Sequence, residues 1–231
     1  MGKVIEVKEL YKLYKVGDEI VRALNGVDFS VNKGEFCSIV GTSGSGKSTL
    51  LNMLAGLEKP TKGQIMIAGK SIEKLSEEEL IAFRRDHVGF IFQSFQLLSS
   101  LNALENIALP LSFMGMAKDK REKKAKEMIQ LVGLAKHQKH LPTQMSGGQQ
   151  QRVGVARALV VNPDIIFADE PTGNLDSNTS REIMDLMKKV VKEQGKTIIM
   201  VTHDDNLAKE ADKIIRIKDG NIISIKGNEE D

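Results

Sequence analysis

The chain has 231 residues, of which 41% are hydrophobic, and this is enough to bury the core of one substantial domain. Its 33 Lys and Arg residues nearly balance its 31 Asp and Glu residues, and the net charge of +2 excludes the concentrated positive field of a dedicated nucleic-acid binder. Cys37 is the only cysteine, so a disulfide within the chain is impossible and a reducing environment is expected.

The first residues do not have the pattern of a signal peptide. Residues 1–6 lack the basic start and apolar stretch of a signal peptide, and no uncharged apolar run approaches the roughly 18 residues that a membrane span needs. Residues 228–231 are polar and are expected to fray. We therefore expect a soluble cytoplasmic protein that can still dock on a membrane protein.

Short runs of strand-forming residues recur along the chain and alternate with helical patterns. The predicted strands cover residues 5–8, 36–40, 88–92, 164–168, 197–202, 213–217 and 222–225. The runs around Ile39, Ile166 and Ile199 are the most apolar, as is typical of strands that are buried on both faces of a parallel sheet. An α/β fold follows.

Residues 94–160 show one helical pattern after another and predict a helical subdomain inserted into an α/β core of residues 1–93 and 161–231. One predicted helix, residues 118–132, carries a cluster of basic side chains: Lys120, Arg121, Lys123, Lys124 and Lys126. Such a cluster can contact anionic lipid or nucleic acid, but Asp119, Glu122 and Glu127 interrupt it, and a solvated helix face is the favoured interpretation.

A glycine-rich loop follows the strand that ends at Val40 and precedes a helical run. It consists of Gly41, Thr42, Ser43, Gly44, Ser45, Gly46, Lys47, Ser48 and Thr49. Glycines allow the loop's N–H groups to converge on phosphate oxygens, Lys47 is expected to reach the β- and γ-phosphates, and Ser48 to offer its hydroxyl to Mg²⁺. The alternative is a strand-to-helix turn that binds nothing. It is disfavoured because the spacing of Gly41, Gly46, Lys47 and Ser48, the strand before the loop and the helix after it all match a phosphate-binding loop. The sequence predicts a nucleoside triphosphate site.

Two carboxylates close the apolar run that ends at Ala168. In a protein with a phosphate loop, Asp169 at the end of a neighbouring strand can hold Mg²⁺, and Glu170 beyond it can polarise the attacking water. Taken alone, two acidic residues at the end of an apolar run often mark only the point where a strand reaches solvent. The nearby phosphate loop favours the functional interpretation.

The segment 144–152 reads Gln-Met-Ser-Gly-Gly-Gln-Gln-Gln-Arg and precedes a predicted helix at 153–160. It resembles the signature motif of ATP-binding cassette (ABC) proteins, and its place between the phosphate loop and Asp169 is the family's order. The resemblance runs from about Val4 to Lys226. It implies a P-loop NTPase core with a mainly parallel sheet, an antiparallel β subdomain and an inserted α-helical subdomain.

The resemblance also assigns roles to single residues. Tyr14 resembles the aromatic that stacks on adenine, although Tyr11 is an alternative, and Gln93 the glutamine that senses Mg²⁺ and the subdomain. His203 resembles the switch histidine, and residues 174–176 the loop that crosses a dimer interface. Structural alternatives remain, because Gln93 can simply cap a strand and His203 can be a satisfied structural histidine.

His137 and His140 are three residues apart and superficially resemble metal ligands. No cysteine accompanies them, so we expect two solvated loop residues.

The signature segment adds a second helix-entry phosphate site, formed by Ser146, Gly147, Gly148 and Gln149. The resemblance implies two copies packed head to tail, each ATP lying between the phosphate loop of one copy and the signature segment of the other. It implies an ATPase that uses ATP and Mg²⁺ and drives separate integral membrane permease subunits from the inner face of the cell membrane, without a nucleic-acid partner.

Several phrases, among them residues 84–95, 101–111 and 169–176, resemble the macrolide-export, lipoprotein-release and antimicrobial-peptide-resistance branch of the family. Met145 departs from the usual leucine and Thr42 from a frequent proline, and neither change opposes ATP binding. Export or extraction of a peptide, lipoprotein or drug-like cargo is expected, but its identity is not encoded here. Two alternative functions are an ABC ATPase that acts on ribosomes or DNA, and a module that binds nucleotide without hydrolysing it.

Overall fold

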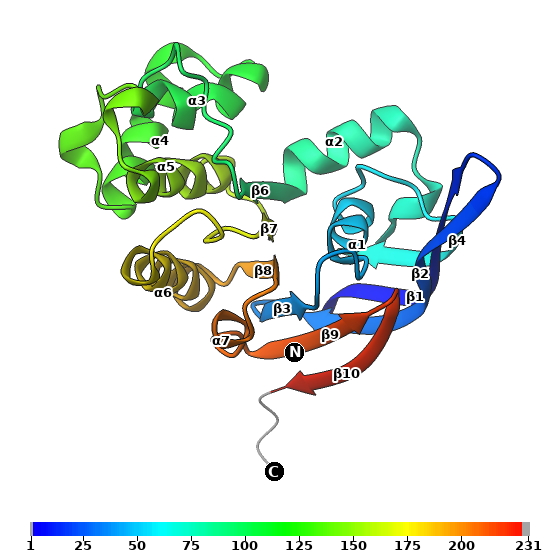
Figure 1. Cartoon of the computed structure of the whole chain (residues 1–231). Helices are drawn as coiled ribbons and strands as arrows, with labels where there is room; N and C mark the ends of the chain where they lie inside the picture. The colour runs from blue at the N-terminus through cyan, green and yellow to red at the C-terminus, as the bar shows by residue number, and fades with distance from the viewer. Residues whose placement is uncertain (1, 228–231) are drawn as a thin grey trace.

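The computed structural model describes residues 2–227 and contains two β-sheets with helices packed against them (Figure 1). The larger sheet has the strand order β10-β9-β3-β8-β7-β6, and only the pair β9 and β10 is antiparallel. Its strands are β3 (Phe36–Val40), β6 (Val88–Phe92), β7 (Ile165–Asp169), β8 (Thr197–Thr202), β9 (Lys213–Lys218) and β10 (Asn221–Gly227). The predicted α/β core with a mainly parallel sheet is confirmed.

Helices cover both faces of this sheet, so its central strands are buried along their whole length. Every residue of β3 and β8 is buried. Cys37 and Ile39 pack into one apolar cluster with α1 (Lys47–Leu54), while Phe36 packs into a second cluster with α6 (Ser177–Gln194). Both faces of each strand need apolar side chains, which explains why the sequence shows continuous apolar runs there.

The smaller sheet has the order β2-β1-β4-β5 and is antiparallel throughout. Its strands are β1 (Lys3–Val16), β2 (Glu19–Asn32), β4 (Lys62–Ile67) and β5 (Lys70–Ser71). In this sheet, the sequence predicted a strand only at residues 5–8, which belong to β1. Repeated register shifts between β1 and β2 break the alternation of apolar and polar residues, and the outer ends of both strands are exposed, so the pattern is weak.

Three α-helices occupy the segment between β6 and β7 and pack against one another at one corner of the molecule (Figure 1). They are α3 (Ala103–Phe113), α4 (Lys118–Leu131) and α5 (Gly147–Leu159). The predicted helix at 118–132 is therefore confirmed to within one residue. Helical structure does not start at residue 94, because turns fill the stretch before Asn102, which caps α3 together with Glu105. The subdomain limits at 94 and 160 stay a prediction.

The remaining helices are short or lie at the edges of the sheets. They are α2 (Glu77–His87), α7 (Asp205–Ala208) and the 3₁₀ helices Ile72–Lys74, Ala135–His137 and Pro142–Gln144. Within residues 2–227, no helix combines the length and the apolar character that crossing a bilayer requires. The expected fraying at 228–231 lies outside the described residues.

Candidate functional site

The phosphate loop connects β3 to α1 and leaves the start of α1 without a side-chain cap. Gly46 is the N-cap, with a φ of 100°, and a Cβ at this position would lie 2.4 Å from the Ala23 carbonyl oxygen. Glycine is required there both by the backbone angle and by the close approach of β2. The uncapped N–H groups of α1 carry partial positive charge and are available to an anion.

Lys47 is almost completely buried, with 6% of its surface exposed, and its Nζ donates to the carbonyl oxygens of Gly41 and Thr42 at 2.9 Å each. The Ser45 hydroxyl is also buried and has no hydrogen-bond partner among the described residues. The loop therefore contains the buried Lys47 ammonium and the unpaired Ser45 hydroxyl. Phosphate oxygens would give both groups a hydrogen-bond partner.

The loop faces a cavity of about 670 Å³. The cavity is lined by Tyr14, Val21, Arg22, Ala23, Ser43, Gly44, Gly46, Lys47, Ser48, Thr49, Glu170 and His203. Its size lies within the range of about 300–1,000 Å³ that is common for small-molecule sites. Residues that are far apart in the sequence thus meet around one space large enough for a nucleotide.

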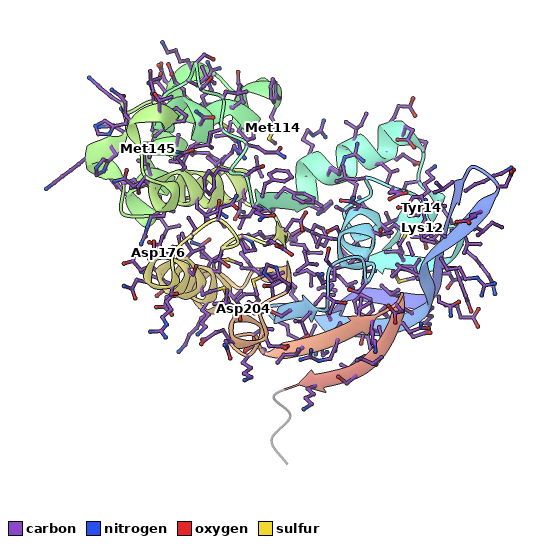
Figure 2. The ribbon with its side chains drawn as sticks, in the orientation of Figure 1. Lys12, Tyr14, Met114, Met145, Asp176 and Asp204 are labelled. Atoms are coloured by element: carbon purple, nitrogen blue, oxygen red, sulfur yellow. The ribbon has the colours of Figure 1, made fainter. Side chains whose placement is uncertain are left out.

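Tyr14, and not Tyr11, lines this cavity. Its hydroxyl donates to Glu58 Oε2 at 2.8 Å, and Lys12 Nζ lies 5.0 Å from the ring centroid (Figure 2). Burial, and then the hydrogen bond with Glu58, raise the pKa of Tyr14, so the phenol stays neutral. Lys12 also pairs with Glu58 at 2.8 Å, which holds its ammonium group beside the ring.

Lys12 and Glu58 were not predicted. Lys12 is two residues before Tyr14 on the same strand, and side chains at this spacing share a face of the sheet. The sequence spacing could therefore have indicated that Lys12 lies beside Tyr14. Nothing in the sequence connects Glu58 with Tyr14, because the two are brought together only by the fold.

Asp169 ends β7 and is brought next to Ser48. Burial, and then the neighbouring charge of Glu170, raise the pKa of the Asp169 carboxyl, while a hydrogen bond with Ser48 and the charge of Lys47 oppose this rise. A desolvated carboxylate beside a hydroxyl is a donor set that a hard cation such as Mg²⁺ prefers.

Glu170 and His203 form a pair at the edge of the cavity. The His203 Nδ1 lies 3.0 Å from Glu170 Oε2, with 62% of the His203 side chain and 22% of the Glu170 side chain exposed. Glu170 has a φ of 43°, which residues other than glycine seldom adopt, and its N–H donates to the Val201 carbonyl oxygen at 3.0 Å. Strained backbone of this kind gathers at functional sites.

Gln93 follows β6 but does not line the cavity. Its Nε2 lies 3.4 Å from Asn174 Oδ1, and its carbonyl oxygen accepts from Asn174 Nδ2 at 3.1 Å. The structure therefore connects Gln93 with the 174–176 loop rather than with Ser48 and Asp169.

The signature segment lies away from the cavity. Figure 2 shows Met145, the residue before Ser146, on the opposite side of the molecule from Tyr14. Ser146 caps α5, where its hydroxyl accepts from the Gln149 N–H at 3.3 Å and its own N–H donates to Gln149 Oε1 at 3.0 Å. None of Ser146, Gly147, Gly148 and Gln149 lines the nucleotide cavity of its own chain.

His137 and His140 differ from the prediction of solvated loop residues. Both are partly buried, their rings meet edge to face with centroids 4.9 Å apart, and His137 Nε2 lies 3.4 Å from Gln149 Nε2. The segment before the signature packs against α5, and spacing alone could not reveal this contact.

Comparisons with known proteins agree with this geometry. A family model described as ABC transporter matches residues 24–173. An ABC transporter ATP-binding protein of Thermotoga maritima is 47% identical over 226 residues, covering 98% of this chain and 96% of that protein. The macrolide export ATP-binding/permease protein MacB of Hyphomonas neptunium is 46% identical over 98% of this chain, which spans 35% of the MacB length.

A solved structure gives the same result. The ATP-binding cassette MJ0796, from Methanocaldococcus jannaschii, in a dimeric post-hydrolysis state bound to ADP and Pi, matches with a TM-score of 0.90 and 45% identity, covering 98% of this chain and all of that one. This chain belongs to the ATP-binding cassette family, as an ABC transporter ATPase domain.

Proposed function

We propose that this chain is the subunit that binds and hydrolyses ATP for a separate membrane permease. The observation that carries the proposal is the cavity in which Lys47, Ser48, Glu170 and Tyr14 meet. Tyr14 lines this cavity and offers its ring to adenine. The phosphate loop and the start of α1 offer N–H groups and the Lys47 ammonium to the phosphates.

The hydrolytic step follows from the pair at the edge of the cavity. Glu170 accepts a proton from the attacking water, and His203, 3.0 Å away, orients the carboxylate and the γ-phosphate. Ser48 and Asp169 would hold Mg²⁺, which supplies charge neutralisation at the β- and γ-phosphates when bound. Gln93 can join them only after its weak 3.4 Å contact with Asn174 is released.

The second half of the site comes from a second copy. Ser146, Gly147, Gly148 and Gln149 lie outside the cavity of their own chain, and Ser146 and Gln149 use their N–H groups in the cap of α5. The first-turn N–H groups of Gly147 and Gly148 are therefore left to bind a nucleotide held by another molecule. Two copies packed head to tail, around two ATP, satisfy this requirement, and the dimeric state named for MJ0796 supports the arrangement. ATP binding then closes the dimer, and hydrolysis opens it.

A groove on the opposite side of the helices suits the permease. It measures about 530 Å³. Phe90 and Phe92 of β6, Phe113 at the end of α3 and the following Met114 supply apolar surface, and Arg84, Arg85 and Arg157 also line the groove. Phe113 has 80% of its surface exposed, which is unusual for a residue of this size. A cytoplasmic segment of an integral membrane permease fits there and would place this chain at the inner face of the membrane. Similarity to MacB supports export or extraction of a peptide, lipoprotein or drug-like cargo.

The test is Glu170→Gln, which removes the base and keeps an oxygen within reach of His203. We expect ATP hydrolysis to fall by at least about 10²-fold, the lower end of a general-base contribution, while ATP binding persists. Gel filtration with saturating ATP should then show a dimer. Lys47→Ala serves as the control, because it should lose ATP binding and stay monomeric. A monomeric Glu170→Gln protein with ATP bound would contradict the two-copy site.

A further inference from the structure

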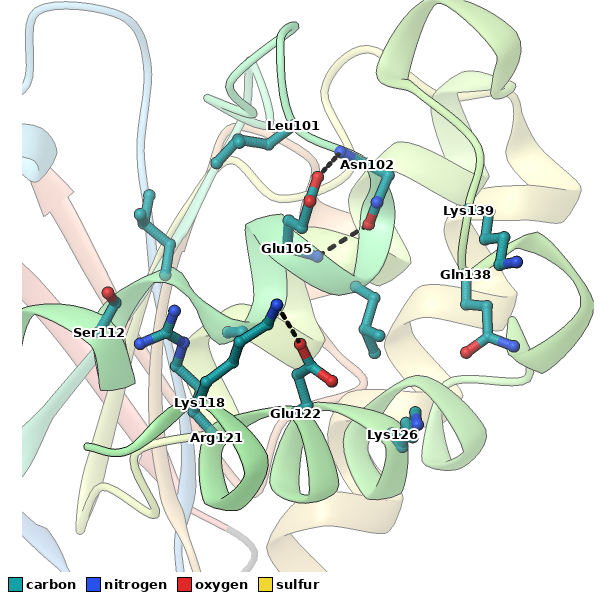
Figure 3. A pocket seen from close by; sticks show the side chains of 13 residues that line it. Leu101, Asn102, Glu105, Ser112, Lys118, Arg121, Glu122, Lys126, Gln138 and Lys139 are labelled. Carbon is teal, nitrogen blue, oxygen red and sulfur yellow. Dashed lines mark hydrogen bonds and ion pairs between the residues drawn. The ribbon is translucent and has the colours of Figure 1, made fainter.

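A second large cavity lies on the helical corner of the molecule, away from the nucleotide site. It measures about 640 Å³ and lies between α3, α4 and the loop that follows α4 (Figure 3). Its lining residues are Leu101, Asn102, Leu104, Glu105, Ala108, Leu109, Ser112, Lys118, Arg121, Glu122, Lys126, Gln138 and Lys139. None of them lines the nucleotide cavity or the groove proposed for the permease.

The cavity has an apolar wall and a cationic rim. Leu101, Leu104, Ala108 and Leu109 supply the apolar wall from the α3 side. Lys118, Arg121 and Lys126 come from α4, and Lys139 comes from the following loop (Figure 3). The structure thus separates the basic cluster of the α4 sequence into two groups, because Lys120, Lys123 and Lys124 do not line the cavity.

Most of the positive charge at this rim is uncompensated. Lys118 pairs with Glu122 at 3.8 Å, and the Glu105 carboxylate accepts from the Asn102 N–H at 2.9 Å in the cap of α3. In the described part of the chain, Arg121, Lys126 and Lys139 form no ion pair. Arg121 donates one hydrogen bond, from Nη1 to the Met116 carbonyl oxygen at 3.3 Å, which leaves its other N–H groups available.

We propose that this cavity is a docking site for an acidic segment of a partner protein that also carries apolar side chains. The leucine wall would take the apolar side chains, and Arg121, Lys126 and Lys139 would pair with carboxylates. Arg121 and Lys126 are five residues apart, which is about 7.5 Å along the helix axis at 1.5 Å per residue. Carboxylates two residues apart on an extended segment, or four apart on a helix, span a similar distance.

A concave site favours a peptide over a membrane surface. An anionic bilayer is broad, so it would contact the exposed Lys120, Lys123 and Lys124 of α4 as readily as the cations at the rim of the cavity. A lipid surface would also meet Glu105 and Glu122 among the lining residues, whereas a peptide can place its carboxylates beside the cations alone.

The experiment starts with a library of random 12-residue peptides displayed on phage and selected against the immobilised full chain. The selected peptide is labelled with fluorescein, and its Kd is measured by anisotropy against the wild type and two charge-reversed proteins. Lys126→Glu with Lys139→Glu alters the rim of the cavity, and Lys120→Glu with Lys123→Glu alters the outer face of α4 as the matched control. All four lysines are exposed, so neither double variant is expected to unfold the protein.

We expect the selected peptides to be rich in Asp or Glu together with Leu, Ile or Phe. The rim variant should weaken binding by at least about tenfold, and the control by less than about threefold, because the control charges are separated from the peptide by solvent. Equal losses in both variants would show general charge attraction and overturn the proposal. So would selection of peptides without acidic residues, or binding only to vesicles that contain phosphatidylglycerol.

Discussion

Asp169 is kept in an unfavourable state by its surroundings. Its carboxyl is partly buried and lies beside Glu170, and both conditions penalise its charged form. Replacing Asp169 by Asn removes the charge but keeps an oxygen for the Ser48 hydroxyl. We expect Asp169→Asn to stabilise the chain without nucleotide and metal, and to reduce hydrolysis by roughly 10²-fold or more. Chemical denaturation in EDTA and a phosphate-release assay measure the two effects.

The pH dependence of this stabilisation has a definite sign. Because the pKa of Asp169 is raised in the folded protein, the folded state binds the proton more tightly than the unfolded chain, whose value is about 3.9. Wild-type stability therefore decreases, relative to Asp169→Asn, as the pH rises through the raised pKa. The difference between the two proteins should be small near pH 4 and complete at neutral pH. If the stability difference between the wild type and Asp169→Asn increased as the pH was lowered, burial could not be what raises the pKa of Asp169.

The sequence indicated which single residues gather at the cavity better than it indicated the partners that they contact. Glycine spacing was enough to indicate the loop that holds Lys47, because few structures other than a phosphate cradle need that pattern. The choice between Tyr11 and Tyr14 remained open until the structure placed Tyr14 at the cavity, since it depends on how β1 bends across β2. The contact of His137 with Gln149 was missed because it depends on tertiary packing alone.

At the level of elements, the start of α5 packs tightly against the start of α6. A Cβ at Gly148 would lie 2.4 Å from Thr179 Cγ2. Thr179 is fixed by the Asp176 carboxylate, which accepts from the Thr179 hydroxyl at 2.6 Å and from the Thr179 N–H at 3.0 Å. Gly148→Ala should therefore destabilise the chain by about 1–3 kcal/mol, the usual cost of overpacking. Denaturant unfolding measures this loss.

Thr179→Ser provides the control for this contact. Serine lacks the methyl group and keeps the hydroxyl that donates to Asp176. The double variant Gly148→Ala with Thr179→Ser should recover most of the lost stability, and the double-mutant cycle should report a coupling above about 0.5 kcal/mol. Stability losses that simply add would show that the methyl group introduced by Gly148→Ala meets something other than Thr179.

Strands were predictable where both faces are buried. The predicted limits 36–40 and 197–202 coincide with those of β3 and β8, because an uninterrupted apolar run has few alternatives. The limits 88–92 also coincide with those of the edge strand β6, in which only Gly89 and Ile91 are buried. β2 was missed, since its exposed residues and its register shifts against β1 break the period of two. β4 was missed although its residues alternate regularly in burial. The irregular stretch before α3 was also missed, because its leucines continue the apolar content of the helices around it.

On the scale of the whole molecule, the proposed function assigns separate tasks to three surfaces. The phosphate loop, Tyr14 and Glu170 surround one cavity, the signature segment lies elsewhere, and the groove beside Phe113 opens on a third part. The parallel sheet connects them, because Asp169 and Glu170 follow β7 while Gln93 follows the adjacent β6. A change at the γ-phosphate can therefore reach the helical corner through the ends of two neighbouring strands.

Phe113 offers a test of this division. Since 80% of its surface is exposed, Phe113→Ser should change the free energy of unfolding by less than about 0.5 kcal/mol and leave ATP hydrolysis of the isolated chain unchanged. If the groove receives a permease, the fraction of this chain recovered with cell membranes should fall several-fold. Ile20→Ser is the matched control, because Ile20 is 66% exposed at the β1–β2 hairpin, far from the groove. Equal membrane recovery of the Phe113→Ser and Ile20→Ser proteins would show that the permease docks on a different surface.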